Sequence, residues 1–208
     1  MAATSRTLLV LFLLITLSAF SASGAENPIT SKIKVSEVTF EDEAMEICVL
    51  ERSGDILVNE VDRIYCEDMN ISSAKGIEVF TSLKKLDLGG NQLTKIDLSH
   101  NTALVELDLR ENQLTTIDLS QNTALTTLWL WNSNLTTIDL SQNTELESLD
   151  LDENNLTTID LSQNTALKEL FILRNPLATI DLSQNTTLKT VAFDSTVECT
   201  GTACSECR

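Results

Sequence analysis

Leucine, isoleucine and asparagine recur through most of this chain at a fixed period. The string Ile-Asp-Leu-Ser-x-Asn-Thr occurs five times at intervals of 21 residues, beginning at Ile96, Ile117, Ile138, Ile159 and Ile180. Each unit contains two similar halves, which first read Leu83-x-x-Leu86-x-Leu88-x-x-Asn91 and Leu93-x-x-Ile96-x-Leu98-x-x-Asn101. A repeat of this length predicts a solenoid, in which each unit forms one coil and contacts only its neighbours.

Each half of a unit predicts one short extended segment. Successive side chains of a strand point to opposite faces, so the alternation places both apolar residues inward and the residue between them outward. Coils stacked at about 4.8 Å then share one apolar core and pair their backbones. Asn91 and its equivalents fall where the chain turns away from the first segment. They are either ordinary turn asparagines or a ladder of inward side chains that bond neighbouring coils, and the fixed register favours the ladder.

The pattern L-x-x-L-x-L-x-x-N-x-L resembles the leucine-rich repeat family. Its two-halves form resembles the short, 21-residue bacterial class of that family, to which secreted internalin-like proteins belong, and the resemblance covers residues 61 to about 193. It implies a mainly β solenoid, curved or nearly flat, with two short extended segments per coil. It also implies binding of other macromolecules, usually proteins, although a scaffold alone does not fix function.

The residues before the repeats predict a cap. Residues 26–60 do not repeat, and their apolar spacing predicts a short amphipathic helix from about Glu41 to Glu51. Such a helix would cover the apolar end of the first coil, as a solenoid requires for solubility, and the layout resembles internalin-like amino-terminal caps. Cys48 lies on this helix and Cys66 at an inward strand position. A disulfide between them would fix the cap to the coil, and two buried free thiols are the alternative.

Residues 194–208 form a tail that contains Cys199, Cys204 and Cys207. Two of these cysteines can pair, which leaves a third that could link two chains. The spacing Cys204-x-x-Cys207 is typical of zinc and redox motifs, but no second ligand pair and no histidine lie nearby in the sequence. We therefore expect a small terminal disulfide loop.

The outward positions of the first halves vary, whereas the second halves are nearly constant. Specific recognition needs a surface that is not self-similar, so we expect the binding face on the first-half segments. Exposed aromatic residues and arginine are typical of interfaces. The predicted binding residues are Trp129, Trp131, Phe171, Leu173, Arg110 and Arg174. The alternatives are stacking of sugars on the same aromatic rings, or side chains that only pack laterally on one another or against the cap.

The constant halves predict a column of carboxylates on the solenoid, formed by Asp97, Asp118, Asp139, Asp160 and Asp181. Cation binding by a structural envelope protein is one interpretation, because calcium prefers oxygen ligands. A solvated, solubilising face is favoured, because no unit supplies the glycine-bearing loop of a dedicated calcium site. An ice-binding plane is disfavoured by the same charges.

The first 25 residues have the form of a secretory signal peptide. Arg6 precedes an apolar run from Leu8 to Ala19, and small residues at Ser23 and Ala25 form the cleavage site. A membrane anchor is the alternative, but the run is well short of the ~20 residues that a spanning helix needs. We expect a secreted or extracellular protein without a membrane span. The periplasm and the cell surface are the alternative locations.

Charge and composition exclude several kinds of partner and of enzymatic site. The chain has 14 Lys+Arg against 31 Asp+Glu, a formal net charge of -17, which argues against nucleic acids and anionic membranes as partners. The single histidine, His100, replaces a repeat glutamine, and no nucleophile elbow, phosphate loop or zinc helix motif occurs. We expect no enzyme, no catalytic residue, no metal and no cofactor. The expected partner is a protein, with carbohydrate as the alternative.

Overall fold

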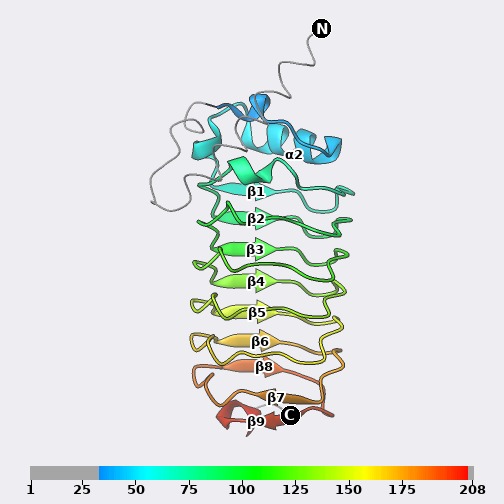
Figure 1. Cartoon of the computed structure of the whole chain (residues 1–208), viewed down its shortest axis with the longest axis vertical. Coiled ribbons are helices and arrows are strands. Elements are labelled where there is room, and N and C mark those ends of the chain that lie inside the picture. Colours follow the sequence, from blue (N-terminus) through cyan, green and yellow to red (C-terminus); the bar gives the residue numbers. More distant parts are fainter. Residues whose placement is uncertain (1–32, 206–208) are drawn as a thin grey trace.

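The first halves of the repeats become the strands of one parallel sheet. The computed structural model describes residues 33–205, and the predicted signal peptide (residues 1–25) and Cys207 lie outside this range. The seven strands follow in the order β1 (Arg63–Tyr65), β2 (Lys85–Asp87), β3 (Glu106–Asp108), β4 (Thr127–Trp129), β5 (Ser148–Asp150), β6 (Glu169–Phe171) and β8 (Thr190–Ala192). They stack one above another, one strand per coil (Figure 1). The predicted mainly β solenoid is therefore confirmed.

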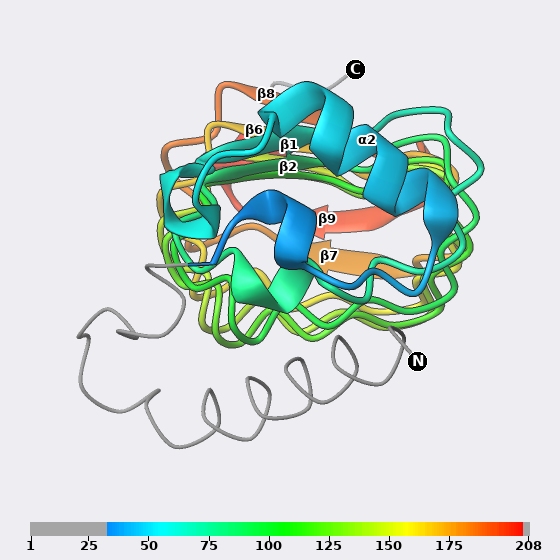
Figure 2. The same cartoon turned by 90° about the horizontal axis from the view of Figure 1, so that it is seen from above.

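The second halves form the opposite side of the solenoid, as Figure 2 shows from above. Only the last of them is a regular strand, β7 (Thr179–Asp181), which pairs in parallel with β9 (Glu198–Thr200) of the tail. The expectation that both apolar residues of this segment point inward is correct only in part. Leu93 and Leu98 are buried, whereas Ile96 is only half-buried, as are Ile117, Ile138 and Ile159. The leucines on either side already fill the interior, so these isoleucines cover the edge of the core.

Two ladders of asparagine join the coils. The ladder of Asn91 and its equivalents is the one that the fixed register predicts, and Ser133 interrupts it; the ladder of the second halves is not among the predicted features. In the first halves, the Asn91 amide oxygen accepts the N–H groups of Met69 and Ile71, and its nitrogen donates to carbonyls that include that of Cys66. In the second halves, each asparagine is fully buried and donates to two backbone carbonyls of the preceding coil. This second ladder consists of Asn101, Asn122, Asn143, Asn164 and Asn185.

The amino-terminal cap contains the expected helix, displaced by two residues. Helix α2 (Glu43–Ser53) begins after Asp42, whose side chain accepts the N–H groups of Ala44 and Met45. Capping of these free donors by an aspartate is what fixes the start of the helix. The helix lies across the end of the first coil and buries Met45, Cys48 and Val49 (Figures 1 and 2). Short 3-10 turns lie at Val35–Glu37, Val58–Glu60, Ile77–Val79 and Thr202–Ser205.

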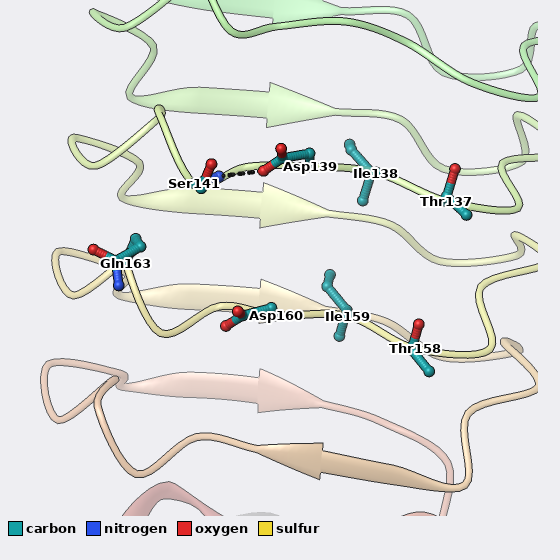
Figure 3. A pocket seen from close by; sticks show the side chains of 8 residues that line it. All are labelled: Thr137, Ile138, Asp139, Ser141, Thr158, Ile159, Asp160 and Gln163. Atoms are coloured by element: carbon teal, nitrogen blue, oxygen red, sulfur yellow. Dashed lines mark hydrogen bonds between the residues drawn. The ribbon is translucent and has the colours of Figure 1, made fainter.

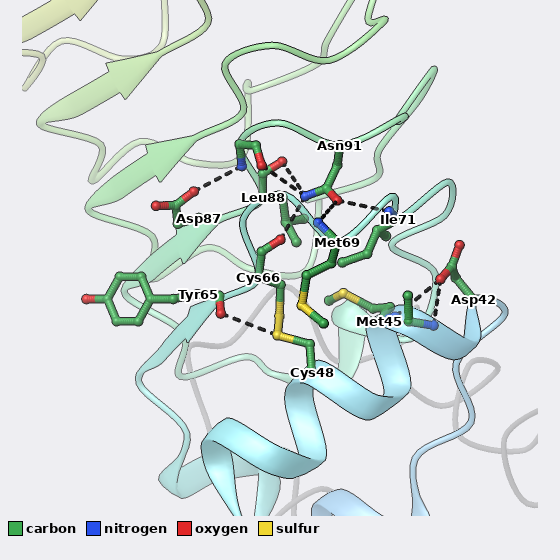
Figure 4. The surroundings of a disulfide bond; sticks show 12 residues. Asp42, Met45, Cys48, Tyr65, Cys66, Met69, Ile71, Asp87, Leu88 and Asn91 are labelled. Atoms are coloured by element: carbon green, nitrogen blue, oxygen red, sulfur yellow. Dashed lines mark hydrogen bonds between the residues drawn. A yellow bond between two sulfur atoms is a disulfide. The ribbon is translucent and has the colours of Figure 1, made fainter.

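Both expected disulfide regions contain a bond. Cys48 of α2 is bonded to Cys66, which follows β1, so the cap is covalently joined to the first coil (Figure 4). In the tail, Cys199 of β9 is bonded to Cys204. Within residues 33–205, no helix has the length and apolar character that a membrane crossing requires.

Candidate binding face

The register of the sheet sorts the variable residues into straight columns. Each strand pairs residue for residue with the next, so the third residues of the strands lie side by side. This column reads Tyr65, Asp87, Asp108, Trp129, Asp150, Phe171 and Ala192. A second column, two residues further along each coil, includes Arg110, Trp131, Asp152 and Leu173, whose carbonyls accept N–H groups of the preceding coil. We call the surface formed by these two columns the variable face.

The four apolar residues predicted for binding all lie on the variable face. Trp129 and Phe171 occupy the first column two coils apart, and Trp131 and Leu173 occupy the second column with the same separation. All four are half-buried, so the prediction of exposed side chains is wrong in degree. Neighbours in a column are only about 4.8 Å apart, and they cover the sides of each ring. No ring stacks on either tryptophan within residues 33–205.

The two predicted arginines are engaged in ion pairs within the chain. Arg110 contacts the Asp108 carboxylate at 2.6 Å and that of Glu67 at 3.3 Å. Arg174 lies on the turn after β6, where its guanidinium contacts Glu153. Arg110 therefore holds together the amino-terminal part of the variable face, and Arg174 lies at its margin.

Three carboxylates of the first column, Asp87, Asp108 and Asp150, are buried or half-buried. Asp108 is only 3% exposed, and burial raises its pKa although Arg110 opposes the shift. Burial raises the pKa of Asp150 to about 6, and the charges of Asp152 and Asp108 add to this effect. Burial and a hydrogen bond with Glu67 raise the pKa of Asp87 to about 7. The sequence marks these positions as outward and acidic, but the degree of burial depends on which side chains the adjoining coils present.

Tyr65 is an aromatic residue of the variable face that the repeat comparison did not identify. It is 37% exposed, and its ring points away from the disulfide of the cap (Figure 4). Its signal in the sequence is its place between the inward residues Ile64 and Cys66, which makes it the outward residue of the first coil. The other exposed large apolar side chains within residues 33–205 are Ile47 and Ile56 of the cap.

The nearly constant second halves form the opposite side of the solenoid, which includes Asp97, Asp118, Asp139, Asp160 and Asp181, and we call it the constant face. Its aspartates have a local structural role. The Asp139 carboxylate accepts the N–H of Ser141 at 2.9 Å, and this bond lowers the pKa of Asp139. The same bond to a serine two residues later recurs in the other coils. A shallow hollow between two coils is lined by residues that include Ile138, Asp139, Ile159 and Asp160 (Figure 3). In the described range, no three metal-ligating His, Cys, Asp or Glu side chains gather together.

Comparisons with known proteins agree with this architecture. A sequence model of the Leucine Rich Repeat family matches residues 82–100. The functional domain of InlJ from Listeria monocytogenes, whose description includes a cysteine ladder, is 32% identical with a TM-score of 0.73. That match covers 77% of this chain and 38% of InlJ.

Two further Listeria monocytogenes structures share the fold. Internalin InlF is 23% identical, with a TM-score of 0.64, over 80% of this chain and 59% of that one. Internalin C2 is 20% identical, with a TM-score of 0.59, over 81% of this chain and 90% of that one. This chain thus spans less than two thirds of the length of InlJ and of InlF. No curated protein sequence matches it. The period of 21 residues, the asparagine ladders, the capping helix and these similarities together place the chain in the leucine-rich repeat family, with coils of the bacterial internalin-like form.

Proposed function

We propose that this chain is a secreted, non-enzymatic binding module that recognises a protein partner through the variable face. Both described disulfides suit an oxidising compartment, as does the signal peptide predicted from the sequence. The similarity to internalins supports a role in macromolecular binding.

One observation carries the assignment to the variable face. The register of the sheet collects the non-repeating side chains on one side of the solenoid, while the opposite side repeats the same threonine, isoleucine and aspartate in coil after coil. The variable side presents Trp129, Trp131, Phe171 and Leu173 around β5. Aromatic side chains dominate the energetics of protein interfaces because they bury a large area at low cost in conformational entropy.

Selection of phage-displayed random twelve-residue peptides on the purified chain tests this proposal. We expect the wild-type chain to enrich peptides that bind at least tenfold more weakly to the variant Trp129→Ala/Trp131→Ala. The matched control is Thr137→Ala/Thr158→Ala on the constant face, which should bind as the wild type does. The single variants Trp129→Gln and Trp131→Gln keep the test informative where the double variant does not fold, as judged by thermal unfolding.

The results that would overturn the proposal are specific. Peptides that bind the tryptophan variants and the wild type equally would show that the variable face is not the site. A glycan array that gives tryptophan-dependent binding, with no peptide selected, would replace the protein partner by a carbohydrate. Sugars also stack on aromatic rings, so this second class uses the same residues.

A further inference from the structure

The carboxylates of Asp150, at the end of β5, and of Asp152, just after it, lie between two coils that present apolar side chains to this face. The register pairs Trp129 of β4 with Asp150 of β5, and Asp150 with Phe171 of β6. Beyond the strands, the backbone bonds continue, so Asp152 lies between Trp131 and Leu173 in the second column. Each of these two carboxylates therefore has an apolar side chain one coil away on both sides, at about 4.8 Å.

These two carboxylates form no ion pair within residues 33–205. Asp87 of the first column also lacks one, but it is hydrogen-bonded to Glu67 and has no tryptophan or phenylalanine on an adjoining coil. Asp150 accepts the N–H of Asp152 at 3.0 Å, and Asp152 accepts the N–H of Leu173 at 2.6 Å. Nearby acids are paired, as Glu106 is with Lys85, Asp108 with Arg110 and Glu153 with Arg174.

Two partly desolvated negative charges bordered by aromatic rings complement one kind of group. A lysine or arginine side chain can place its cation on the carboxylates while its methylenes cover the rings. The cation is also attracted by the face of a tryptophan or phenylalanine ring. An acidic or purely apolar segment would leave the carboxylates buried without compensation, which is costly.

We propose that Asp150 and Asp152, bordered by Trp129, Trp131 and Phe171, form a subsite that binds a basic side chain of the protein partner. The inference rests on the proposed function and specifies the chemistry of the partner. The net charge of -17 favours encounter with any cationic segment. The subsite then determines where on the variable face a lysine or arginine side chain binds.

Protonation of Asp150 should weaken this binding. Its pKa is raised to about 6, chiefly by burial, so its charge is lost as the pH falls through 6. No titratable side chain of β4 faces it, and the charged groups around it are Asp152 and Glu153 on its own coil, Asp108 on β3, and Glu169 and Arg174 on the β6 coil. Affinity for a basic peptide should therefore decrease from pH 7.5 to pH 5.

The test uses the peptides selected on the wild-type chain, resynthesised with and without their basic residues. In the second version each Lys or Arg is replaced by Gln. The variant Asp150→Asn/Asp152→Asn is compared with Asp139→Asn/Asp160→Asn, which removes the same two charges from the constant face. Trp129 and Trp131 are the only tryptophans of the chain, so their fluorescence reports on this surface. The titrations are made at 150 mM NaCl, where the screening length is ~8 Å.

We expect the selected peptides to contain a recurring Lys or Arg, and to bind Asp150→Asn/Asp152→Asn at least tenfold more weakly. The control variant should change their affinity less than twofold, and the Gln peptides should bind the wild type about as weakly as the basic peptides bind Asp150→Asn/Asp152→Asn. Selected peptides without basic residues, or equal losses in both charge variants, would overturn the inference. Binding that depends on the tryptophans but not on Asp150 and Asp152 would leave the proposed function intact and remove the subsite alone.

Discussion

The two asparagine ladders make different contributions to stability, although both are buried. Asn154 is 5% exposed, and its amide oxygen accepts the N–H groups of Leu135 at 2.8 Å and Ser133 at 3.3 Å. Its nitrogen donates to the carbonyls of Leu130 and Leu151, at 2.8 and 3.0 Å, and to that of Asp152. No other bond in the described residues serves the two N–H groups, so replacing Asn154 with alanine leaves them buried and unpaired.

Asn143 is fully buried, but no backbone group depends on it alone for a hydrogen bond. Its nitrogen donates to the carbonyls of Leu119 at 3.1 Å and Asn122 at 2.9 Å, and its amide oxygen has no partner within residues 33–205. Both carbonyls also accept a backbone N–H, from Asn122 and Leu125 respectively. They therefore remain bonded when the side chain is removed, and the unpaired oxygen disappears with it.

These contacts set the expected magnitudes. A hydrogen bond contributes about 1 kcal/mol net, and a buried group left without a partner costs about 1–3 kcal/mol. On this basis Asn154→Ala should lower the free energy of unfolding by roughly 3–5 kcal/mol, and Asn143→Ala by at most about 1.5 kcal/mol. The more completely buried side chain is thus expected to matter less.

Urea unfolding of both variants, with the disulfides intact, measures this difference. The free energy of unfolding must depend on urea concentration with the same slope in both variants. A different slope would mean that part of the solenoid unfolds separately. The reasoning would be refuted by losses in the free energy of unfolding that lie within about 1 kcal/mol of each other, or by a larger loss for Asn143→Ala. Either result would show that the bonds to the amide oxygen are not what makes the first ladder more stabilising.

Two further predictions concern the cap and the variable face. Cys48→Ala/Cys66→Ala opens a loop with a sequence separation of 18 and should lower the free energy of unfolding by about 3 kcal/mol; an unchanged calorimetric melting temperature would contradict this. Asp150 binds its proton more tightly in the folded state, with a pKa of about 6 against 3.8 for an unperturbed aspartate, so wild-type stability should fall as the pH rises from about 4 to 6. Asp150→Asn should therefore be more stable than the wild type by on the order of 1 kcal/mol at pH 7.5, a value reduced for partial solvent exposure, and no more stable at pH 4. Urea unfolding at the two pH values checks this, and a loss of stability at pH 7.5 would contradict it.

The sequence predicts the features that repeat. A period of 21 residues with inward leucines specifies parallel strands in register, because no other stacking buries every coil. Asparagine at a fixed position after four of the first segments, as Asn91, Asn112, Asn154 and Asn175, predicts the ladder, since the turn leaves backbone groups that need partners. The cap helix and its disulfide follow from helical spacing and from one cysteine on each side of the junction.

The features that the sequence does not predict depend on contacts between coils. Ile96 and Leu98 have the same spacing as Leu86 and Leu88, yet Ile96 is only half-buried. The pattern specifies which residues are apolar, but not how wide the interior is. Asp108 is buried because the Arg110 side chain forms an ion pair with it, and periodicity carries no information about that side-chain conformation.

The fold constrains the position of Asp150 only weakly. The other coils place Tyr65, Asp87, Trp129, Phe171 or Ala192 in the same column, so the backbone accepts aromatic, acidic and small residues there alike. An unpaired, half-buried carboxylate at such a position lowers stability at neutral pH, and an asparagine or threonine would avoid the cost. Residues that reduce stability without serving the fold are typical of functional sites. If Asp150→Asn is more stable than the wild type at neutral pH and also binds the basic peptides more weakly, the same side chain both lowers stability and contributes to binding.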